Sequence, residues 1–274
     1  MDRRGFLRRT GAAAGTIGVG AGLAGCADLA DGGGGAGVEE RDLPERPDDL
    51  GPESVAEYVA AYEEVHAHNR HAAEGAVEVA IDAVATFDHA SGDDHYATAQ
   101  HAGSVYHEND DGARSVGELY GDPVPYLVTP ERTLRLGVER RAIETDDRGD
   151  DGDTASDDER TSPPLGVRLL NVTEEARELA VTVTRRATAD RDGEAEDRVA
   201  DFDVAIDPET AVEVRSITDV RGGYRIIGRM EDNGITGEGR IEVELPSADR
   251  GPNVDIAVDR NGVSTWHLPS FEGV

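Results

Sequence analysis

Three of the eight histidines in this 274-residue chain lie within six positions of one another, at His66, His68 and His71. On a helix, His68 and His71 share a face at a spacing of i, i+3, and Glu64 joins them at i, i+4 to His68. Imidazole and carboxylate groups bind zinc and copper, so Glu64, His68 and His71 form a candidate metal site. The segment contains no HExxH motif, and polar residues opposite an apolar stripe are usually the solvated face of a helix. We therefore expect no bound metal and no other cofactor.

Other catalytic chemistry has no motif to support it. The chain contains no nucleophile motif of the GxSxG or SxxK type and no Walker loop. The acidic stretch 147–158 matches a calcium-binding EF-hand loop at its glycine, but it lacks a ligand at the third position and has no flanking helices. Catalytic carboxylate pairs are identified by burial, which a sequence does not show. We therefore predict that the chain is not an enzyme.

The single cysteine, Cys26, lies at the end of an apolar N-terminal segment. Residues 1–9 are basic, and residues 10–25 are moderately apolar and rich in glycine, which is the pattern of a signal peptide. The apolar stretch is shorter than the ~20 residues that a membrane-spanning helix needs. A glycine-rich segment follows the cysteine, so we expect no core that could bury this thiol.

Two short motifs in this segment resemble known export signals. Arg3-Arg4, followed by Phe6-Leu7, is similar to the twin-arginine signal, and the Leu-Ala-Gly-Cys sequence of 23–26 resembles the lipobox of bacterial and archaeal lipoproteins. The resemblance implies export of an already folded protein, cleavage after residue 25 and attachment of lipid to Cys26. We therefore expect a protein that is anchored by lipid to the extracellular face of the cell membrane.

Asn171 begins the only N-glycosylation motif of the chain, Asn171-Val172-Thr173. Because the chain carries an export signal, this asparagine is a candidate site of N-glycosylation. Such motifs also arise by chance, so the sequence leaves the occupancy of this site open.

The chain is strongly acidic, with 58 acidic and 27 basic residues, a formal net charge of -31, and arginine as its only basic residue type apart from histidine. This charge excludes electrostatic binding to nucleic acid or to anionic lipid, because both require a basic surface. The acidic residues cover the whole chain and are not collected in a tail. This distribution and the absence of lysine resemble the proteins of salt-loving archaea, which implies a habitat and not a cationic partner.

The composition divides the chain into five segments. Low-complexity acidic stretches cannot bury enough apolar surface to fold, and like charges keep them extended. We therefore predict a signal peptide at 1–25, a flexible tether at 26–50, a first domain at 51–141, a disordered linker at 142–164 and a second domain at 165–274.

The first domain is predicted to be an α+β module with one helix on an antiparallel sheet. Pro52 favours the start of a helix that ends near 71–75, and apolar residues follow it at helical spacing: Val55, Tyr58, Val59, Tyr62 and Val65. Alternation predicts strands at 77–87, 96–106, 114–119, 124–128 and 133–138. The "YE…HN" sequence within 58–69 resembles the opening helix of an uncharacterised domain in secreted haloarchaeal proteins, which implies this fold and no activity.

Alternating apolar residues also run through the second domain. They predict short strands at 179–183, 202–206, 224–230, 241–245 and 254–258, separated by turn sequences. This spacing is typical of a sandwich or barrel. The domain resembles the disulfide-free immunoglobulin-like domains of haloarchaeal surface proteins, with Trp266 in the last strand, which implies an Ig-like β-sandwich.

These features predict a non-catalytic envelope protein of a halophilic archaeon that binds or presents an unidentified protein or ligand, or is structural. The alternative is a small-ligand or metal-binding module in the first domain, serving uptake or redox chemistry, or a small enzyme. A pocket between helix and sheet, lined by convergent polar groups, would favour the alternative. An exposed apolar patch or open strand edge on the sandwich would favour a protein partner.

Overall fold

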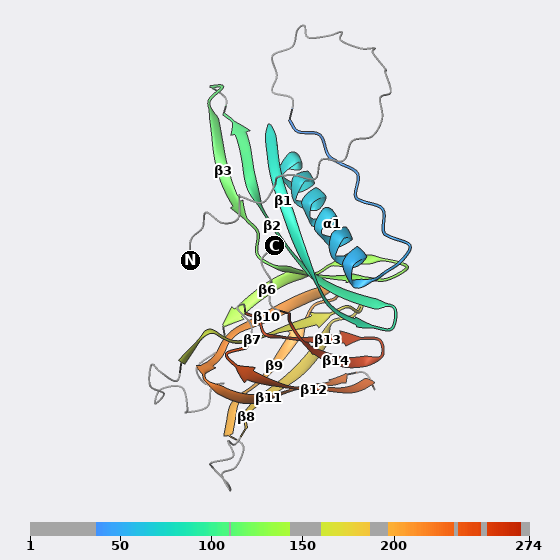
Figure 1. The fold of residues 1–274 in the computed structure, drawn as a ribbon, viewed down its shortest axis with the longest axis vertical. Coiled ribbons are helices and arrows are strands. Elements are labelled where there is room, and N and C mark those ends of the chain that lie inside the picture. The colour runs from blue at the N-terminus through green and yellow to red at the C-terminus, as the bar shows by residue number, and fades with distance from the viewer. Residues whose placement is uncertain are drawn as a thin grey trace, which may run out of the picture. The chain divides into compact units, whose positions relative to one another are not determined.

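A computed structural model of the chain describes residues 37–109, 111–142, 160–186, 197–232, 235–247 and 251–269. These residues form mostly β-strands and one helix (Figure 1). Arg3 and Arg4, the residues of the predicted export signal, and Cys26, the predicted lipidation site, lie outside the described residues. Among the described residues, no helix has the length and hydropathy needed to span a bilayer.

The single helix, α1 (Pro52–Ala73), starts and ends where the sequence predicts. Pro52 occupies the first turn, and the Ser54 Oγ accepts a hydrogen bond from the Gly51 backbone N–H at 2.9 Å. The helix ends before Gly75, whose φ of 83° is readily adopted only by glycine. Val55 and Val59 are fully buried against the sheet, which confirms the predicted apolar stripe.

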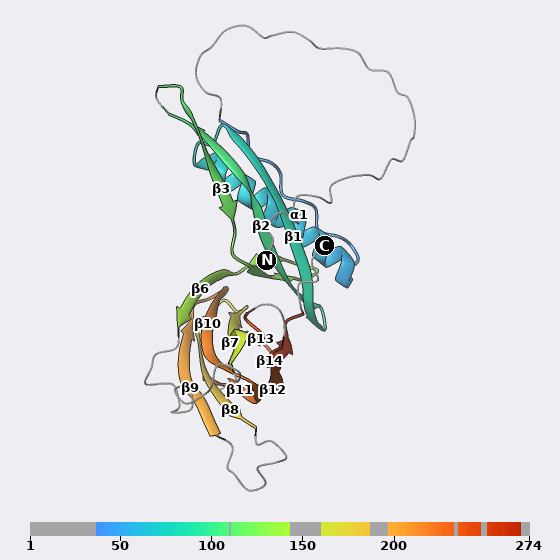
Figure 2. The ribbon, with the colours of Figure 1, turned by 60° about the vertical axis from the view of Figure 1, so that its left-hand side comes forward.

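The helix packs on the first of three sheets, as Figures 1 and 2 show for its contact with β1 and β2. This sheet is antiparallel and has five strands. The strands are β1 (Glu78–Ser91), β2 (Asp94–Glu108), β3 (Arg114–Tyr120), β4 (Val124–Val128) and β5 (Thr133–Arg135). Strand β2 pairs with β1 along its length, with β4 through its first half and with β3 through its second half. The long β2 therefore organises both the helix-facing surface and the two strands beside it.

The other two sheets face each other and enclose the largest apolar core. One has the order β14-β13-β7-β10-β6 and the other the order β12-β11-β8-β9. Their strands are β6 (Gly137–Ala142), β7 (Arg160–Asn171), β8 (Arg177–Arg185), β9 (Asp197–Ile206), β10 (Thr210–Val220), β11 (Gly222–Asp232), β12 (Ile235–Leu245), β13 (Val254–Asp259) and β14 (Gly262–His267). Alternate residues of both sheets, such as Val181 and Ile256, point into this core. The second domain is therefore a two-sheet β-sandwich.

The boundary between the two domains differs from the predicted one. The strand expected at 133–138 is interrupted at Leu136, which is fully buried, and its two halves belong to different sheets. Strand β6 pairs in parallel with β10 of the sandwich, so 137–141 lie in the second sheet. Residues 160–164, expected in the disordered linker, are the first residues of β7.

Part of the predicted tether is ordered along the helix. Residues 37–50 are described, and Asn69 holds them through two hydrogen bonds to the backbone of Arg41, one accepted from its N–H and one donated to its carbonyl, both at 2.8 Å. The Val38 N–H also donates to the carbonyl of Ala76 at 2.9 Å. The prediction of a flexible segment was therefore wrong for this half of 26–50, because polar contacts with the helix replace the apolar burial that its composition lacks.

The two domains share a small apolar cluster. Its buried members come from the first sheet, from the sandwich and from the connection between them: Tyr96, Leu127, Leu136, Leu170, Val172, Ala211, Ala257 and Trp266. Trp266 lies 4.6 Å from Tyr96 and stacks on His89 at 4.7 Å, measured between ring centroids. The described residues from 37 to 269 accordingly belong to one compact unit.

A buried ion-pair network reinforces this contact. Arg168 on β7 is 1% exposed and donates two hydrogen bonds to the carboxylate of Asp255 on β13, at 2.9 and 2.6 Å. The same guanidinium donates to the Thr98 Oγ1 on β2 at 2.9 Å and lies 3.6 Å from the carboxylate of Asp88 on β1. The network therefore joins two strands of the first sheet to two strands of the sandwich.

Candidate functional site

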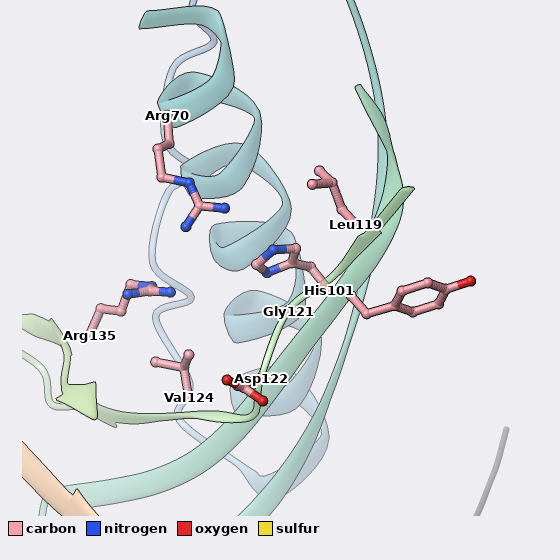
Figure 3. Close-up of a pocket in the computed structure, with 8 residues that line it drawn as sticks. Arg70, His101, Leu119, Gly121, Asp122, Val124 and Arg135 are labelled. Atoms are coloured by element: carbon pink, nitrogen blue, oxygen red, sulfur yellow. The ribbon is translucent and has the colours of Figure 1, made fainter. Parts of the chain in front are cut away.

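A pocket of about 250 Å³ opens between α1 and the first sheet. Figure 3 shows residues that line it, which come from α1, from the strands β2, β3, β4 and β5, and from the connection between β3 and β4. Eight residues line it: the apolar Leu119 and Val124, the polar Arg70, His101, Asp122 and Arg135, and also Tyr120 and Gly121. The pocket therefore combines a short apolar wall with several groups that can be charged.

The polar side of the pocket is built on a buried glutamate of the helix, Glu63, which is 0% exposed. Its carboxylate receives hydrogen bonds from Arg135 Nε at 2.8 Å and Nη2 at 3.1 Å, and from the Tyr126 hydroxyl. Its Oε1 also lies 2.7 Å from the His101 Nδ1. All four contacts come from β2, β4 and β5, so the sheet positions the carboxylate that the helix supplies.

These contacts keep Glu63 ionised. Burial alone would raise the pKa of Glu63, but the hydrogen bonds from His101, Arg135 and Tyr126 outweigh burial and lower that pKa from 4.5 to about 2. Burial and the adjacent carboxylate raise the pKa of Tyr126, which therefore stays a hydroxyl donor. The bonds to Glu63 outweigh burial and raise the pKa of Arg135 as well.

His101 is held against this carboxylate by its own strand and by a glycine. It follows Ala97 and Ala99 at a period of two, so all three face the helix, and its ring is 4% exposed. Gly121 packs over the ring and donates its N–H to the His101 carbonyl at 2.8 Å. A Cβ at position 121 would lie 2.4–2.7 Å from three ring atoms, so the site requires glycine there.

The candidate metal ligands do not converge on one point. Glu64 pairs with Arg41 at 3.4 Å, and the His68 Nε2 lies 3.0 Å from the carbonyl of Glu39. The His71 Nδ1 lies 2.8 Å from the Oε2 of Glu74, which is not one of the three candidate ligands. Within the described ranges, no group of three or more His, Cys, Asp or Glu side chains is arranged to hold a metal ion.

Asn171 is not available for glycosylation in the folded chain, which corrects the prediction of an acceptor there. Its side chain is fully buried, and Nδ2 donates to the carbonyls of Glu175, Ile206 and Asp207 at 2.8, 3.1 and 3.0 Å. A glycan on Nδ2 would break these bonds and would have no space. The Asn171 side chain instead closes the turn between β7 and β8, where its Oδ1 accepts a hydrogen bond from the Thr173 N–H at 3.0 Å.

Three comparisons complete the description of this site. No protein-family model, curated protein or solved structure matches the chain. The site therefore has to be interpreted from its own geometry. One signal for it was present in the sequence: Glu63 falls four residues after Val59, on the apolar stripe of α1, where a charged side chain requires partners. No comparable signal marked His101 or Arg135, because their convergence on Glu63 depends on how the strands pair.

Proposed function

We propose that this chain is a lipid-anchored cell-surface protein whose first domain binds a small anionic ligand in the pocket beside Glu63 and His101. The observation that carries this proposal is the convergence of Arg70 and Arg135 on one pocket of a chain whose net charge is -31. Guanidinium groups recognise carboxylates and phosphates through paired N–H donors. Asp122, the acidic lining residue, lies 3.3 Å from Arg140, which offsets its charge.

The dimensions favour a small ligand. A volume of about 250 Å³ corresponds to roughly eight water molecules at ~30 Å³ each, so the pocket suits an anion with only a few carbon atoms. Leu119 and Val124 supply the apolar wall against which those carbons can pack. A small carboxylate satisfies both the cationic and the apolar side.

Propionate tests this proposal, with propionamide as an uncharged ligand of nearly the same shape. All measurements are made in molar KCl, which keeps the fold stable and the competition from chloride constant. Propionate at millimolar concentration is expected to shift the histidine NMR signals of the protein. Arg70→Gln is expected to weaken that binding about tenfold, because a charge-assisted hydrogen bond contributes ~1.5 kcal/mol or more. Arg229→Gln, in an exposed pair on the sandwich, is the control. Equal affinity for propionate and propionamide, or no response to either, would refute the proposed function.

The anchor part of the proposal rests on the N-terminal sequence. Export through the twin-arginine motif at Arg3 and Arg4 would present a thiol at Cys26 for lipid attachment, and stable anchoring would require two lipid chains because one binds only marginally. We expect the Cys26→Ser protein to leave the membrane fraction after detergent-free washing, whereas the unaltered protein remains. A Cys26→Ser protein that still sediments with membranes would contradict lipid anchoring at this residue.

We also propose that the sandwich is an Ig-like domain that is held outward, together with the first domain, from a halophilic archaeal membrane. Two facing sheets of five and four strands support this assignment. The first domain would then bind the ligand at the cell envelope, and the sandwich would have a structural role.

The proposed saline habitat has a measurable consequence for stability. The screening length is about 3 Å in molar salt and about 10 Å at a tenth of that concentration, so repulsion among the acidic residues increases as salt is removed. We expect the melting temperature to fall steadily as KCl is lowered from molar to dilute concentrations. A melting temperature that does not change over this range would rule out salt-dependent folding.

A further inference from the structure

We infer that the ligand of this pocket is a small 2-hydroxycarboxylate, and that the His101 Nε2 accepts a hydrogen bond from its hydroxyl group. This inference rests on the proposed function, since it specifies the class of anion that the same pocket binds. It makes His101 the residue that determines ligand specificity and Glu63 the residue that positions it.

The first step concerns which ring nitrogen of His101 carries the proton. The Glu63 carboxylate is ionised and can only accept hydrogen bonds, so the His101 Nδ1, at 2.7 Å from it, must be the donor. In a neutral imidazole, protonation of Nδ1 leaves a lone pair on Nε2. The contacts of Arg135 and Tyr126 hold the carboxylate in place, so the buried network fixes the His101 Nδ1 as the donor to Glu63.

The second step concerns what can satisfy that lone pair. Among the residues that the structure describes, none donates a hydrogen bond to the His101 Nε2, although the ring is only 4% exposed. His101 lines the pocket, and Figure 3 shows its ring directed into the space between Arg70 and Arg135. The Nε2 is therefore open to the pocket, where a donor group on a bound ligand can reach it.

The third step identifies the rest of the ligand. Arg70 and Arg135 offer only N–H donors. The Arg135 Nε and Nη2 are bonded to Glu63, and the Arg70 Nη2 lies 3.1 Å from the His71 Nε2, so the Nη1 of Arg135 and the Nε and Nη1 of Arg70 remain to hold a carboxylate. The ligand group that donates to the His101 Nε2 lies close to these two cations, which disfavours an ammonium donor and favours a neutral hydroxyl. A carboxylate with a hydroxyl beside it meets both requirements.

Lactate, propionate and alanine provide the test, because they share a three-carbon carboxylate and differ at the second carbon. In molar KCl, lactate is expected to bind about tenfold more tightly than propionate, which is the effect of one additional hydrogen bond. The nitrogen chemical shifts of His101 are expected to show a protonated Nδ1 and an unprotonated Nε2 before ligand is added.

Two variants connect the preference to His101. His101→Phe removes the acceptor, and Gly121→Ala displaces the ring, because its Cβ would overlap three ring atoms. Both are expected to bind lactate and propionate with equal affinity. The measurements on the unaltered protein decide the inference if either variant fails to fold.

The outcomes separate the two proposals. Equal binding of lactate and propionate by the unaltered protein, or a proton on Nε2, overturns the inference and leaves the anion pocket standing. Tighter binding of alanine than of lactate also overturns it, in favour of an amino acid. If none of the three carboxylates binds, both the inference and the proposed function fail.

Discussion

Replacement of Arg168 by methionine is expected to lower the free energy of unfolding by about 3–5 kcal/mol, the range for breaking a buried ion pair from one side. The substitution removes the guanidinium that donates two hydrogen bonds to the carboxylate of Asp255, which is 0% exposed, and it removes the hydrogen bond to Thr98. Molar salt should not rescue the variant, because a buried pair is screened much less than an exposed one. Urea unfolding at constant KCl measures the difference.

Two further variants make this expectation specific. Arg229 forms an exposed pair with Glu238 at 2.8 Å, and Arg229→Met is expected to cost at most about 1 kcal/mol. Asp255→Leu in addition to Arg168→Met removes the buried carboxylate as well as the guanidinium bonded to it and is expected to recover part of the loss. An Arg168→Met protein as stable as Arg229→Met would show that the network contributes nothing to the contact between the domains.

Acid is expected to remove about 3 kcal/mol of stability through Glu63 alone. The pKa of this carboxyl is about 2 in the folded chain and 4.5 without the fold, and each unit corresponds to about 1.36 kcal/mol. Because the folded pKa is the lower one, the contribution is complete above pH 4.5 and is lost as the pH falls towards about 2. Glu63→Gln cannot ionise, so we expect its stability to decline less over this interval, from a lower value at neutral pH.

Comparison between variants is essential here, because protonation of other acidic residues also relieves repulsion in a chain with a net charge of -31. Glu238→Gln, at an exposed carboxylate, serves as the matched control and is expected to follow the unaltered protein closely. The quantity to compare is the free energy of unfolding of each protein at neutral pH and near pH 3. Parallel curves for Glu63→Gln and the unaltered protein would show that the depressed pKa of Glu63 does not contribute to stability.

The parts of the fold that the sequence predicted are those whose apolar pattern is local. The stripe through Val55 and Val59 gave the helix, and the alternation of Leu179, Val181 and Val183 gave β8, because one buried face is sufficient to reveal each period. The turn at Thr129 is also local, since the Thr129 N–H donates to the Arg132 carbonyl at 2.9 Å.

The parts that it missed depend on contacts between distant segments. The change of sheet at Leu136 leaves no mark on the alternation, because the residues on both sides continue to alternate while their partners change from β4 to β10. The start of β7 was hidden by two prolines and by an acidic run before it. The site was missed for the same reason, because Glu63, His101 and Arg135 meet only after β2 and β5 are placed in one sheet.

The position of Trp266 has an optical consequence. It is the only tryptophan of the chain, it is 5% exposed, and it contacts Tyr96 of the first sheet and His89 of β1 across the boundary between the domains. Selective excitation of indole therefore reports on this boundary alone. Separation of the domains would expose the ring to water and shift its emission to longer wavelength, even while each sheet stays folded. The chain thus carries an intrinsic fluorophore that distinguishes undocking of its domains from their unfolding.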